Sequence, residues 1–211
     1  MKILNLYAGI GGNRKLWGDE HEVTAVENNP EILSIYESFF PEDKTILGDA
    51  HQYLLNHFQE FDFIWSSPPC PTHSRVRKQL AFRRNKDGEK YLQNKPVFPD
   101  MRLYQEIIFL QGYFKGFWIV ENVISYYEPL IKPQKIARHF FWSNFKIKPI
   151  EIKGATHQAT IKEMQNHKGF DISQFKLKHR KDTILRNCVD SNLALHILNC
   201  ALNKSEEQKT F

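Results

Sequence analysis

The hydrophobic positions of this 211-residue chain gather into short continuous runs, separated by turn residues or by amphipathic stretches. Unbroken apolar runs indicate strands that are buried on both faces, as in a parallel sheet covered by helices. Five runs predict such strands, at residues 2–8, 23–27, 45–50, 61–67 and 117–123.

Helical patterns lie between and after these runs. Residues 30–40 follow an Asn cap and carry Pro30 at the first helical position, and residues 101–114 and 190–202 also read as helices. Alternating strands and helices predict an α/β fold with a doubly wound, mostly parallel sheet. Residues 140–152 predict an antiparallel strand pair at its edge.

Two segments lack a strong period. Residues 70–99 predict a long loop, and a loop of that length inside a compact domain is usually functional or mobile. Residues 153–185 are polar without periodicity. The sequence contains no apolar run long enough to span a membrane, and the first run is too short for a signal peptide, so a cytoplasmic protein is expected.

Composition narrows the class of protein. Hydrophobic residues make up 41% and charged residues 25%, which excludes a disordered chain. The three cysteines are odd in number and widely spaced, so they predict neither a disulfide framework nor a zinc site, and no metal is expected.

The charge is segregated along the chain. The net charge is +5, but residues 75–95 and residues 145–186 each carry +6, which leaves −7 on the remainder. Two basic elements on an acidic body indicate a bound polyanion. Two solvated, lysine-rich loops are the alternative interpretation.

Candidate chemistry follows the first three strands. Gly9, Gly11 and Gly12 allow backbone N–H groups to approach a ligand, Glu27 can bind ribose hydroxyls, and Asp49 can accept a hydrogen bond from an adenine amino group. A helix-cap glutamate and a turn aspartate are the ordinary alternatives. Together they predict one nucleoside ligand across consecutive strand ends, without a pyrophosphate, such as S-adenosylmethionine.

Two further residues end the fourth and fifth strands. Cys70 follows two prolines and precedes a basic segment, where positive charge favours thiolate; a buried, inert cysteine is the alternative. Glu121 stands at the tip of an apolar strand, where a carboxylate is costly unless it is paired or functional.

These residues stand in motifs that closely resemble those of the DNA (cytosine-5) methyltransferase family. The motifs YAGIGG, VENNP, GDA, SSPPC, VENV, KIARHFFW and RNCVDSNLALHIL occur in the family's order, over residues 1–145 and 183–200. The resemblance implies S-adenosylmethionine as cofactor, S-adenosylhomocysteine as product, and Cys70 as nucleophile. It also implies that Glu121 engages cytosine N3 and that Arg138 touches the target base or its phosphate. The cofactor-binding residues that it implies are Tyr7, Ala8, Gly9, Ile10, Gly11, Gly12, Glu27, Asn28, Asp49, Ala50, Pro69, Leu103, Asn187 and Cys188.

The chain departs from the family pattern in three places. Pro71 stands where Gln usually follows the cysteine, and only Arg138 remains of an Arg-x-Arg pair. Fewer than fifty residues separate Arg138 from Asn187, where family members carry a separate recognition domain. We therefore expect a core at 1–145, a minimal recognition segment at 146–182, a returning C-terminal helix at 183–203 and a tail at 204–211.

The resemblance implies methylation of cytosine C5 in double-stranded DNA, on a base flipped out of the helix. It suggests a bacterial or phage-encoded enzyme of a restriction–modification type, with a separate specificity or restriction partner. Methylation of RNA, as in the branch of the family that acts on tRNA, and a non-catalytic accessory subunit are the alternatives. The residues expected to bind nucleic acid are Ser74, Arg75, Arg77, Lys78, Arg83, Arg84, Lys176, Lys178, Arg180 and Lys181.

Overall fold

The computed structural model describes residues 1–152 and 159–209 of the chain. The side chains of Arg77, Leu80 and residues 204–209 lie outside the described part. Within the described residues, no helix is long and apolar enough to cross a membrane.

A seven-stranded sheet forms the centre of the protein, in the order β3-β2-β1-β4-β7-β9-β8. The first five strands of that order run parallel, and β9 pairs antiparallel with both β7 and β8. This confirms the doubly wound, mostly parallel sheet with an antiparallel edge. The strands are β1 (Lys2–Leu6), β2 (Glu22–Glu27), β3 (Lys44–Leu47), β4 (Phe63–Ser66), β7 (Phe117–Val123), β8 (Gln134–Ile136) and β9 (His139–Ser143).

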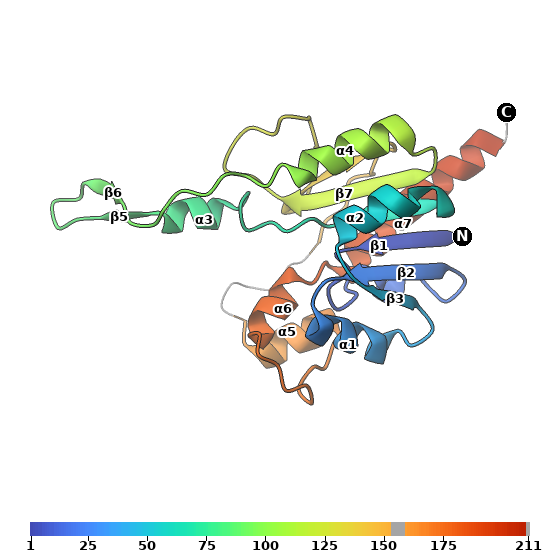
Figure 1. The fold of residues 1–211 in the computed structure, drawn as a ribbon, viewed down its shortest axis with the longest axis horizontal. Coiled ribbons are helices and arrows are strands. Elements are labelled where there is room, and N and C mark those ends of the chain that lie inside the picture. Colours follow the sequence, from blue (N-terminus) through green and yellow to red (C-terminus); the bar gives the residue numbers. More distant parts are fainter. Residues whose placement is uncertain (153–158, 210–211) are drawn as a thin grey trace.

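Helices cover both faces of this sheet (Figure 1). Because side chains alternate along a strand, Ile3 and Trp65 pack in one cluster with α7 (Ser191–Lys209), whereas Leu4 and Ile64 pack in another with α2 and α4. Helix α2 spans Ala50–His57 and α4 spans Arg102–Tyr113. Burial on both faces explains the continuous apolar runs of the strands.

A third cluster joins the basic C-terminal segment to the N-terminal half of the sheet. Met164 and Leu185, from α5 (Ile161–Lys168) and α6 (Lys181–Asn187), pack with Ile35 of α1 (Pro30–Phe39) and with Ile10. Short 3₁₀ turns at Arg14–Leu16 and Phe58–Glu60 complete the connections.

The loop expected at residues 70–99 contains regular structure instead. Helix α3 (Arg75–Leu80) leads into a hairpin of β5 (Phe82–Arg84) and β6 (Lys90–Leu92), and the whole projects from the body as an arm (Figure 1). The Asn85 side chain closes the hairpin turn by accepting hydrogen bonds from the backbone N–H groups of Asp87 and Glu89. We call residues 75–95 the arm.

Two other expectations need correction. The antiparallel edge pair is β8 with β9, and residues 144–152 form no strand, because the Asn144 side chain bonds back to Trp118 N and Gly116 O just after β9 ends. Helix α7 continues to Lys209, so the tail expected from residue 204 begins as helix.

Candidate active site

The glycine turn after β1 is held against the end of β2. Tyr7 (φ 56°) and Gly9 (φ 57°) have left-handed backbone conformations, and the Gly9 N–H donates to Glu27 Oε2 at 3.1 Å. A Cβ on Gly11 would collide with the rings of Tyr36 and Phe40. The turn therefore needs glycine for close approach, and its N–H groups lie at the carboxyl edge of the sheet.

Glu27 is almost buried, and the backbone fixes its carboxylate. Its Oε1 accepts from Asn28 N and Asn29 N at 3.0 and 2.9 Å, while Oε2 accepts from Gly9 N. Asn29, not Glu27, caps α1, so the helix-cap interpretation of Glu27 does not hold. A carboxylate offers about four acceptor sites, which leaves about one for a ribose hydroxyl.

Asp49 has a structural contact as well as an open side. Its Oδ1 caps α2 by accepting from Gln52 N at 3.0 Å, and its side chain is 58% exposed. Ala50 begins α2 and is buried. The turn-aspartate interpretation therefore holds for Oδ1, while Oδ2 lies 3.8 Å from Arg102 Nη1 in an exposed ion pair.

The C-terminal segment returns to the glycine turn, as the sequence predicts. A Cβ on Gly12 would strike the Cys188 sulfur and the Val189 carbonyl oxygen, so the two segments are in close contact. Asn187 ends α6 directly before them. Burial raises the pKa of Cys188 to about 11, which makes this thiol unreactive.

The sequence interpretation missed a buried carboxylate beside the turn. Glu106 of α4 is fully buried and is contacted by Tyr7 OH at 2.6 Å, Ser66 Oγ at 2.5 Å and His51 Nδ1 at 2.9 Å. It joins the ends of β1 and β4 to α2 and α4. Leu103, one turn earlier on α4, is buried in the core. The signal in the sequence was Tyr7 itself, which stands where the resemblance leads one to expect Phe.

Substituting Tyr7 tests this contact. In Tyr7→Phe the ring stays but Glu106 loses one of its three donors, and a hydrogen bond to a charged group contributes about 1.5–3 kcal/mol. We expect the free energy of unfolding, from urea titration, to fall by about that amount. Tyr113→Phe is the matched control, because Tyr113 is 71% exposed at the end of α4. Equal stability of both variants would contradict the role of the contact.

Cys70 lies at the end of β4, in a segment tied to β7. The Asn122 side chain donates to Pro68 O at 2.9 Å, and Cys70 O accepts from His73 N and Ser74 N at 3.0 and 3.1 Å. These bonds fix the Pro68–Pro69 bend that carries the cysteine. Cys70 is a free thiol and is partly exposed.

The charge around Cys70 differs from expectation. Burial raises the pKa of its thiol, and the negative charge of Glu121 raises it further. The hairpin of the basic arm projects away from the body (Figure 1), and Glu121 is the charged group that acts on the Cys70 thiol. The expectation of a thiolate stabilised by positive charge is therefore wrong for this state of the protein.

Glu121 is buried and oriented on both oxygens. Ser67 Oγ donates to Oε2 at 2.9 Å, and Trp65 Nε1 in turn donates to Ser67 Oγ at 2.9 Å. His139 Nε2 lies 3.5 Å from Oε1. A thiol and an oriented carboxylate thus share the carboxyl ends of β4 and β7, the neighbouring strands of the sheet.

Comparison with known proteins identifies this arrangement. Residues 1–93 match the family model of the C-5 cytosine-specific DNA methylases. These residues, less than half of the chain, are similar to the cytosine-C5 methyltransferases. The match confirms the family that the sequence motifs indicated, and S-adenosylmethionine as its cofactor.

Two curated relatives of this chain are tRNA (cytosine(38)-C(5))-methyltransferases. The protein from Spodoptera frugiperda is 35% identical over 85 residues, which cover 37% of this chain and 26% of the relative. The human protein is 22% identical over 173 residues, which cover 71% and 44%. The chain thus spans less than half the length of these relatives. Among solved structures, a Spodoptera frugiperda DNMT2 mutant shares 27% identity over 58% of this chain and 35% of that chain, with a TM-score of 0.39.

The cofactor contact expected of Glu27 can be tested by substitution. Glu27→Ala removes the carboxylate that is expected to bind ribose and also releases the N–H of Gly9. Because bonds to a charged group contribute about 1.5–3 kcal/mol each, we expect the affinity for S-adenosylmethionine to drop about tenfold or more. Calorimetric titration measures this, and Glu22→Ala, on the exposed first position of the same strand, is the control. Unchanged affinity in folded Glu27→Ala would refute the role.

The candidate third catalytic residue, Arg138, lies in the tight turn between β8 and β9. Ala137 precedes it with a left-handed φ of 50°. His139 pairs with Val123 in the antiparallel register, so this turn lies at the carboxyl end of β7, two residues past Glu121. His139 is a further site residue that sequence reasoning missed.

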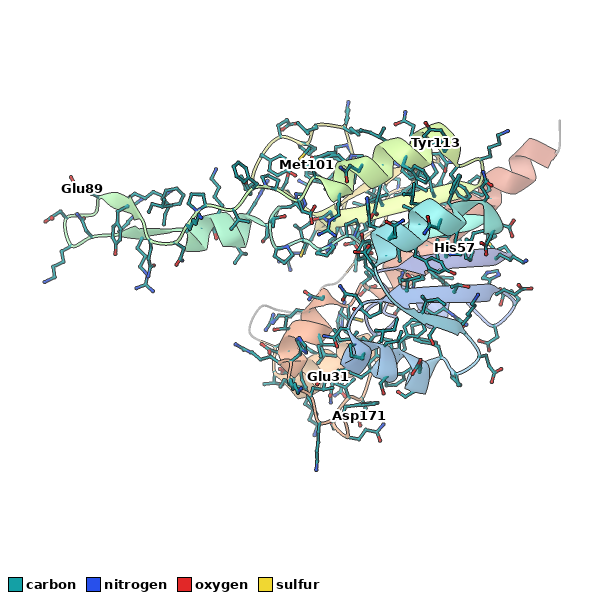
Figure 2. The ribbon with its side chains drawn as sticks, viewed as in Figure 1. Glu31, His57, Glu89, Met101, Tyr113 and Asp171 are labelled. Atoms are coloured by element: carbon teal, nitrogen blue, oxygen red, sulfur yellow. The ribbon has the colours of Figure 1, made fainter. Side chains whose placement is uncertain are left out.

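The two basic segments lie apart on the protein. Figure 2 shows Glu89 at the tip of the arm, and Glu31 and Asp171 in the separate group around α1 and α5. On the arm, Arg83 and Arg84 are exposed, and Arg75 donates to Ser125 O at 3.1 Å. Arg77 is outside the described side chains.

The C-terminal basic residues are exposed but partly engaged. Arg180 forms two hydrogen bonds with Asp182, at 3.0 and 2.8 Å, and Lys181 Nζ donates to Ser173 O at 2.8 Å. The Lys178 backbone N–H donates to Glu31, and Lys176 is exposed. Their charge is therefore partly neutralised within the protein. No group of three or more His, Cys, Asp or Glu suited to a metal occurs among the described residues.

Proposed function

We propose that this chain methylates cytosine at C5 in a nucleic acid, through a covalent bond between Cys70 Sγ and cytosine C6. The observation that carries this proposal is the pairing of Cys70 with the buried, oriented Glu121 beside the family's cofactor turn. Neither a lone cysteine nor a lone carboxylate would support it, because the chemistry needs a nucleophile and a proton-sharing group on one base.

The residues suit the cofactor expected from the family. The Gly9–Gly12 turn leaves open space at Gly9, where a Cβ would meet no atom within 4 Å. Glu27 would hold ribose, Asp49 the adenine amino group, and the segment at Asn187 and Cys188 would close the turn. When bound, S-adenosylmethionine supplies the methyl group.

Cytosine C5 alone is too weak a nucleophile, and Cys70 overcomes this. Addition of its thiolate to C6 forms the C–S bond and shifts an electron pair toward C5, while Glu121 shares a proton with N3 to stabilise the ring charge. After C5 gains the methyl group it loses its proton to a base or water, and the C–S bond breaks to restore the aromatic ring. Cys70 leaves as thiolate.

Glu121 also explains how the raised pKa of Cys70 is compatible with attack. The Glu121 carboxylate disfavours a neighbouring thiolate as long as it is unprotonated. When Glu121 shares a proton with cytosine N3, that repulsion is reduced at the moment the thiolate is needed. Substrate binding would therefore activate the nucleophile.

The substrate is proposed to be DNA, following the description of the matched family. A cytosine stacked in a duplex cannot reach Cys70, so the base must flip out, and the arm would hold the distorted strand. The second candidate is tRNA, because both curated relatives are tRNA methyltransferases. A non-catalytic accessory role is disfavoured, since it gives no chemical reason to retain both Cys70 and Glu121.

One experiment tests the activity and separates the substrates. The protein is expressed in a host without cytosine methylation, and 5-methylcytosine is then mapped in both genomic DNA and tRNA, with Cys70→Ser as the control. Methylcytosine confined to one pool identifies the substrate. Its absence from both pools, in cells that contain folded protein, would refute the enzyme.

Recognition by the segment at 146–182 is expected to rely on the backbone of the nucleic acid. Each bidentate base contact gives roughly 1–3 kcal/mol of discrimination, and so short a segment offers few of them. We expect a short site of about two to four base pairs, or a separate specificity or restriction partner.

Salt dependence measures those backbone contacts. Binding should weaken with a log–log slope of about −0.9 per neutralised phosphate. Changing Lys176, Lys178, Arg180 and Lys181 to Gln should flatten that slope and weaken all sequences alike, but by less than changing Arg83, Arg84, Lys86 and Lys95. The reason is that Arg180 and Lys181 already have partners in the protein. Selective methylation of a single site of about six base pairs or more would contradict this account.

A further inference from the structure

A polar hollow of about 420 Å³ lies between the root of the arm and the loop that follows β7. It is separate from the cofactor turn and contains aromatic, cationic and acidic groups. The residues that line it include Arg75, Lys78, Ser125, Tyr126, Tyr127 and Glu128.

The walls of the hollow continue directly from the two candidate catalytic residues. One wall begins five residues after Cys70 and the other four residues after Glu121. An antiparallel bridge joins Ser74 to Ser125, and the Tyr126 N–H donates to His73 O at 3.1 Å. If the target cytosine of a nucleic acid lies at Cys70 and Glu121, the adjacent nucleotide would therefore lie at this hollow.

The cationic side of the hollow suits a phosphate. The Arg75 Nε donates to Ser125 O at 3.1 Å, which holds the guanidinium at the wall. Lys78 Nζ lies 5.3 Å from the centre of the Tyr126 ring, so positive charge and aromatic surface share the space. Arginine and lysine at a fixed position are the groups that bind phosphate oxygens.

The aromatic side suits a base. The rings of Tyr126 and Tyr127 meet edge to face at 5.1 Å, and Tyr127 OH is fixed by His73 Nδ1 at 2.6 Å and by Tyr104 OH at 3.3 Å. Rings held in this way offer a stacking surface at little entropic cost. Glu128 repels phosphate but can accept hydrogen bonds from the N–H groups of a base. It therefore favours an orientation with the base at the Glu128 side of the hollow and the phosphate at the Arg75 side.

We propose that this hollow binds the unpaired nucleotide adjacent to the target cytosine, with its phosphate on Arg75 and Lys78 and its base against Tyr126. The inference rests on the proposed function, and it adds a substrate class. A base paired inside a continuous duplex cannot reach a tyrosine ring, whereas the bases of loops and single strands are free to do so. The preferred substrate is therefore one in which the neighbour of the cytosine is also unpaired, as in a loop, a single strand or a locally opened duplex.

Binding to short oligonucleotides tests the subsite. The probe is a fluorescein-labelled nine-nucleotide single strand with one central cytosine, in DNA and RNA forms, measured by fluorescence polarisation with S-adenosylhomocysteine present. An abasic nucleotide is placed at each position in turn. Since stacking on an aromatic ring contributes about 1–3 kcal/mol per base, we expect removal of one base next to the cytosine to weaken binding about five- to 150-fold.

The variants connect that loss to the hollow. In Tyr126→Ala the abasic penalty at this position should disappear, while Tyr113→Ala, at the exposed last position of α4, should retain it. Lys78→Gln changes only an exposed side chain and should weaken every oligonucleotide alike, with a smaller salt slope. An abasic penalty that is the same at all positions, or one that survives in folded Tyr126→Ala, would overturn the subsite. A matched duplex that binds as tightly, with the same dependence on Tyr126, would overturn its preference for an unpaired nucleotide.

A separate measurement keeps this inference distinct from the proposed function. Covalent trapping of the same oligonucleotide with 5-fluorocytosine at the centre, with S-adenosylmethionine in place of S-adenosylhomocysteine, reports on attack by Cys70 and methyl transfer and not on the hollow. Trapping that persists in Tyr126→Ala at saturating oligonucleotide, together with the abasic effect in the unmodified protein, supports both proposals. An abasic effect without any trapping would support the subsite but refute the methylation chemistry.

Discussion

Cys70→Ser is expected to lose methyl transfer by about 10⁴-fold or more, which is the scale at which removing a nucleophile affects an enzyme that depends on it. A serine hydroxyl has a far higher pKa than a thiol, and the negative charge of Glu121 disfavours its ionisation further, so it cannot add to C6 as an anion. The side chain is nearly the same size, so the fold and the Pro68–Pro69 bend should be unaffected. Transfer of a radiolabelled methyl group from S-adenosylmethionine to nucleic acid measures the effect.

The control for Cys70→Ser is the cofactor itself. Glu27 and the glycine turn lie on β1 and β2, and Cys70 follows β4, so the affinity for S-adenosylmethionine should stay within about twofold in calorimetry. With S-adenosylmethionine present, nucleic acid containing 5-fluorocytosine should trap the unmodified protein covalently, because after methyl transfer the fluorine on C5 cannot leave as the proton does. Substantial transfer by Cys70→Ser would show that another group is the nucleophile.

The sheet was predictable from sequence because its strands are buried on both faces. Burial of this kind requires continuous apolar runs, and residues 2–8, 23–27 and 117–123 carry them without ambiguity. The family resemblance implied that the segment at Asn187 and Cys188 lies at the glycine turn, and Gly12 is in close contact with Cys188 and Val189. The structure of the arm could not be predicted in the same way. Its hairpin is short and exposed, so no buried face imposes an alternating hydrophobic pattern on the sequence. Its turn depends on a single side chain, Asn85.

The sequence indicated candidate residues at one edge of the sheet, but it misjudged the electrostatics around Cys70. Motif order placed Cys70 and Glu121 at neighbouring strand ends, but charge counts along the sequence suggested that basic residues would lower the pKa of the thiol. In the folded protein, burial and the negative charge of Glu121 raise the pKa of the thiol instead. Glu106 was missed for a related reason, because its partners Tyr7, His51 and Ser66 come from three separate elements and no local spacing joins them.

These contacts indicate a site built in two halves. Glu106 connects the cofactor turn to β4, and the chain from Trp65 through Ser67 to Glu121 connects β4 to β7. Ser66 and Ser67 are adjacent, so the two halves meet immediately before the Pro68–Pro69 bend. A displacement of the cofactor turn or of Glu121 would therefore be transmitted to Cys70. This suits a reaction in which the cofactor and the target base must be aligned with each other.

Glu121→Gln is expected to affect Cys70 in two opposite ways. The amide keeps the shape of the side chain and can still accept from Ser67 Oγ, but it cannot hold the proton shared with cytosine N3. We expect methyl transfer to fall by about 10²–10⁴-fold, the usual contribution of a positioned acid or base. At the same time the negative charge that raises the pKa of Cys70 is removed, so the pKa of the thiol should fall toward its ordinary value.

Alkylation by iodoacetamide in the absence of nucleic acid measures the second effect. Only thiolate reacts, so the rate rises with pH up to the pKa, and the profile of Glu121→Gln should move to lower pH than that of the unmodified protein. Cys70→Ser gives the background from the buried Cys188 and Cys200. Faster alkylation of Cys70 together with slower methyl transfer in Glu121→Gln would show that the variant has lost activation of the cytosine ring and not reactivity of the thiol. If instead the alkylation profile stayed in place, Glu121 would not act on Cys70, and the activation of the nucleophile by substrate binding would have to be abandoned.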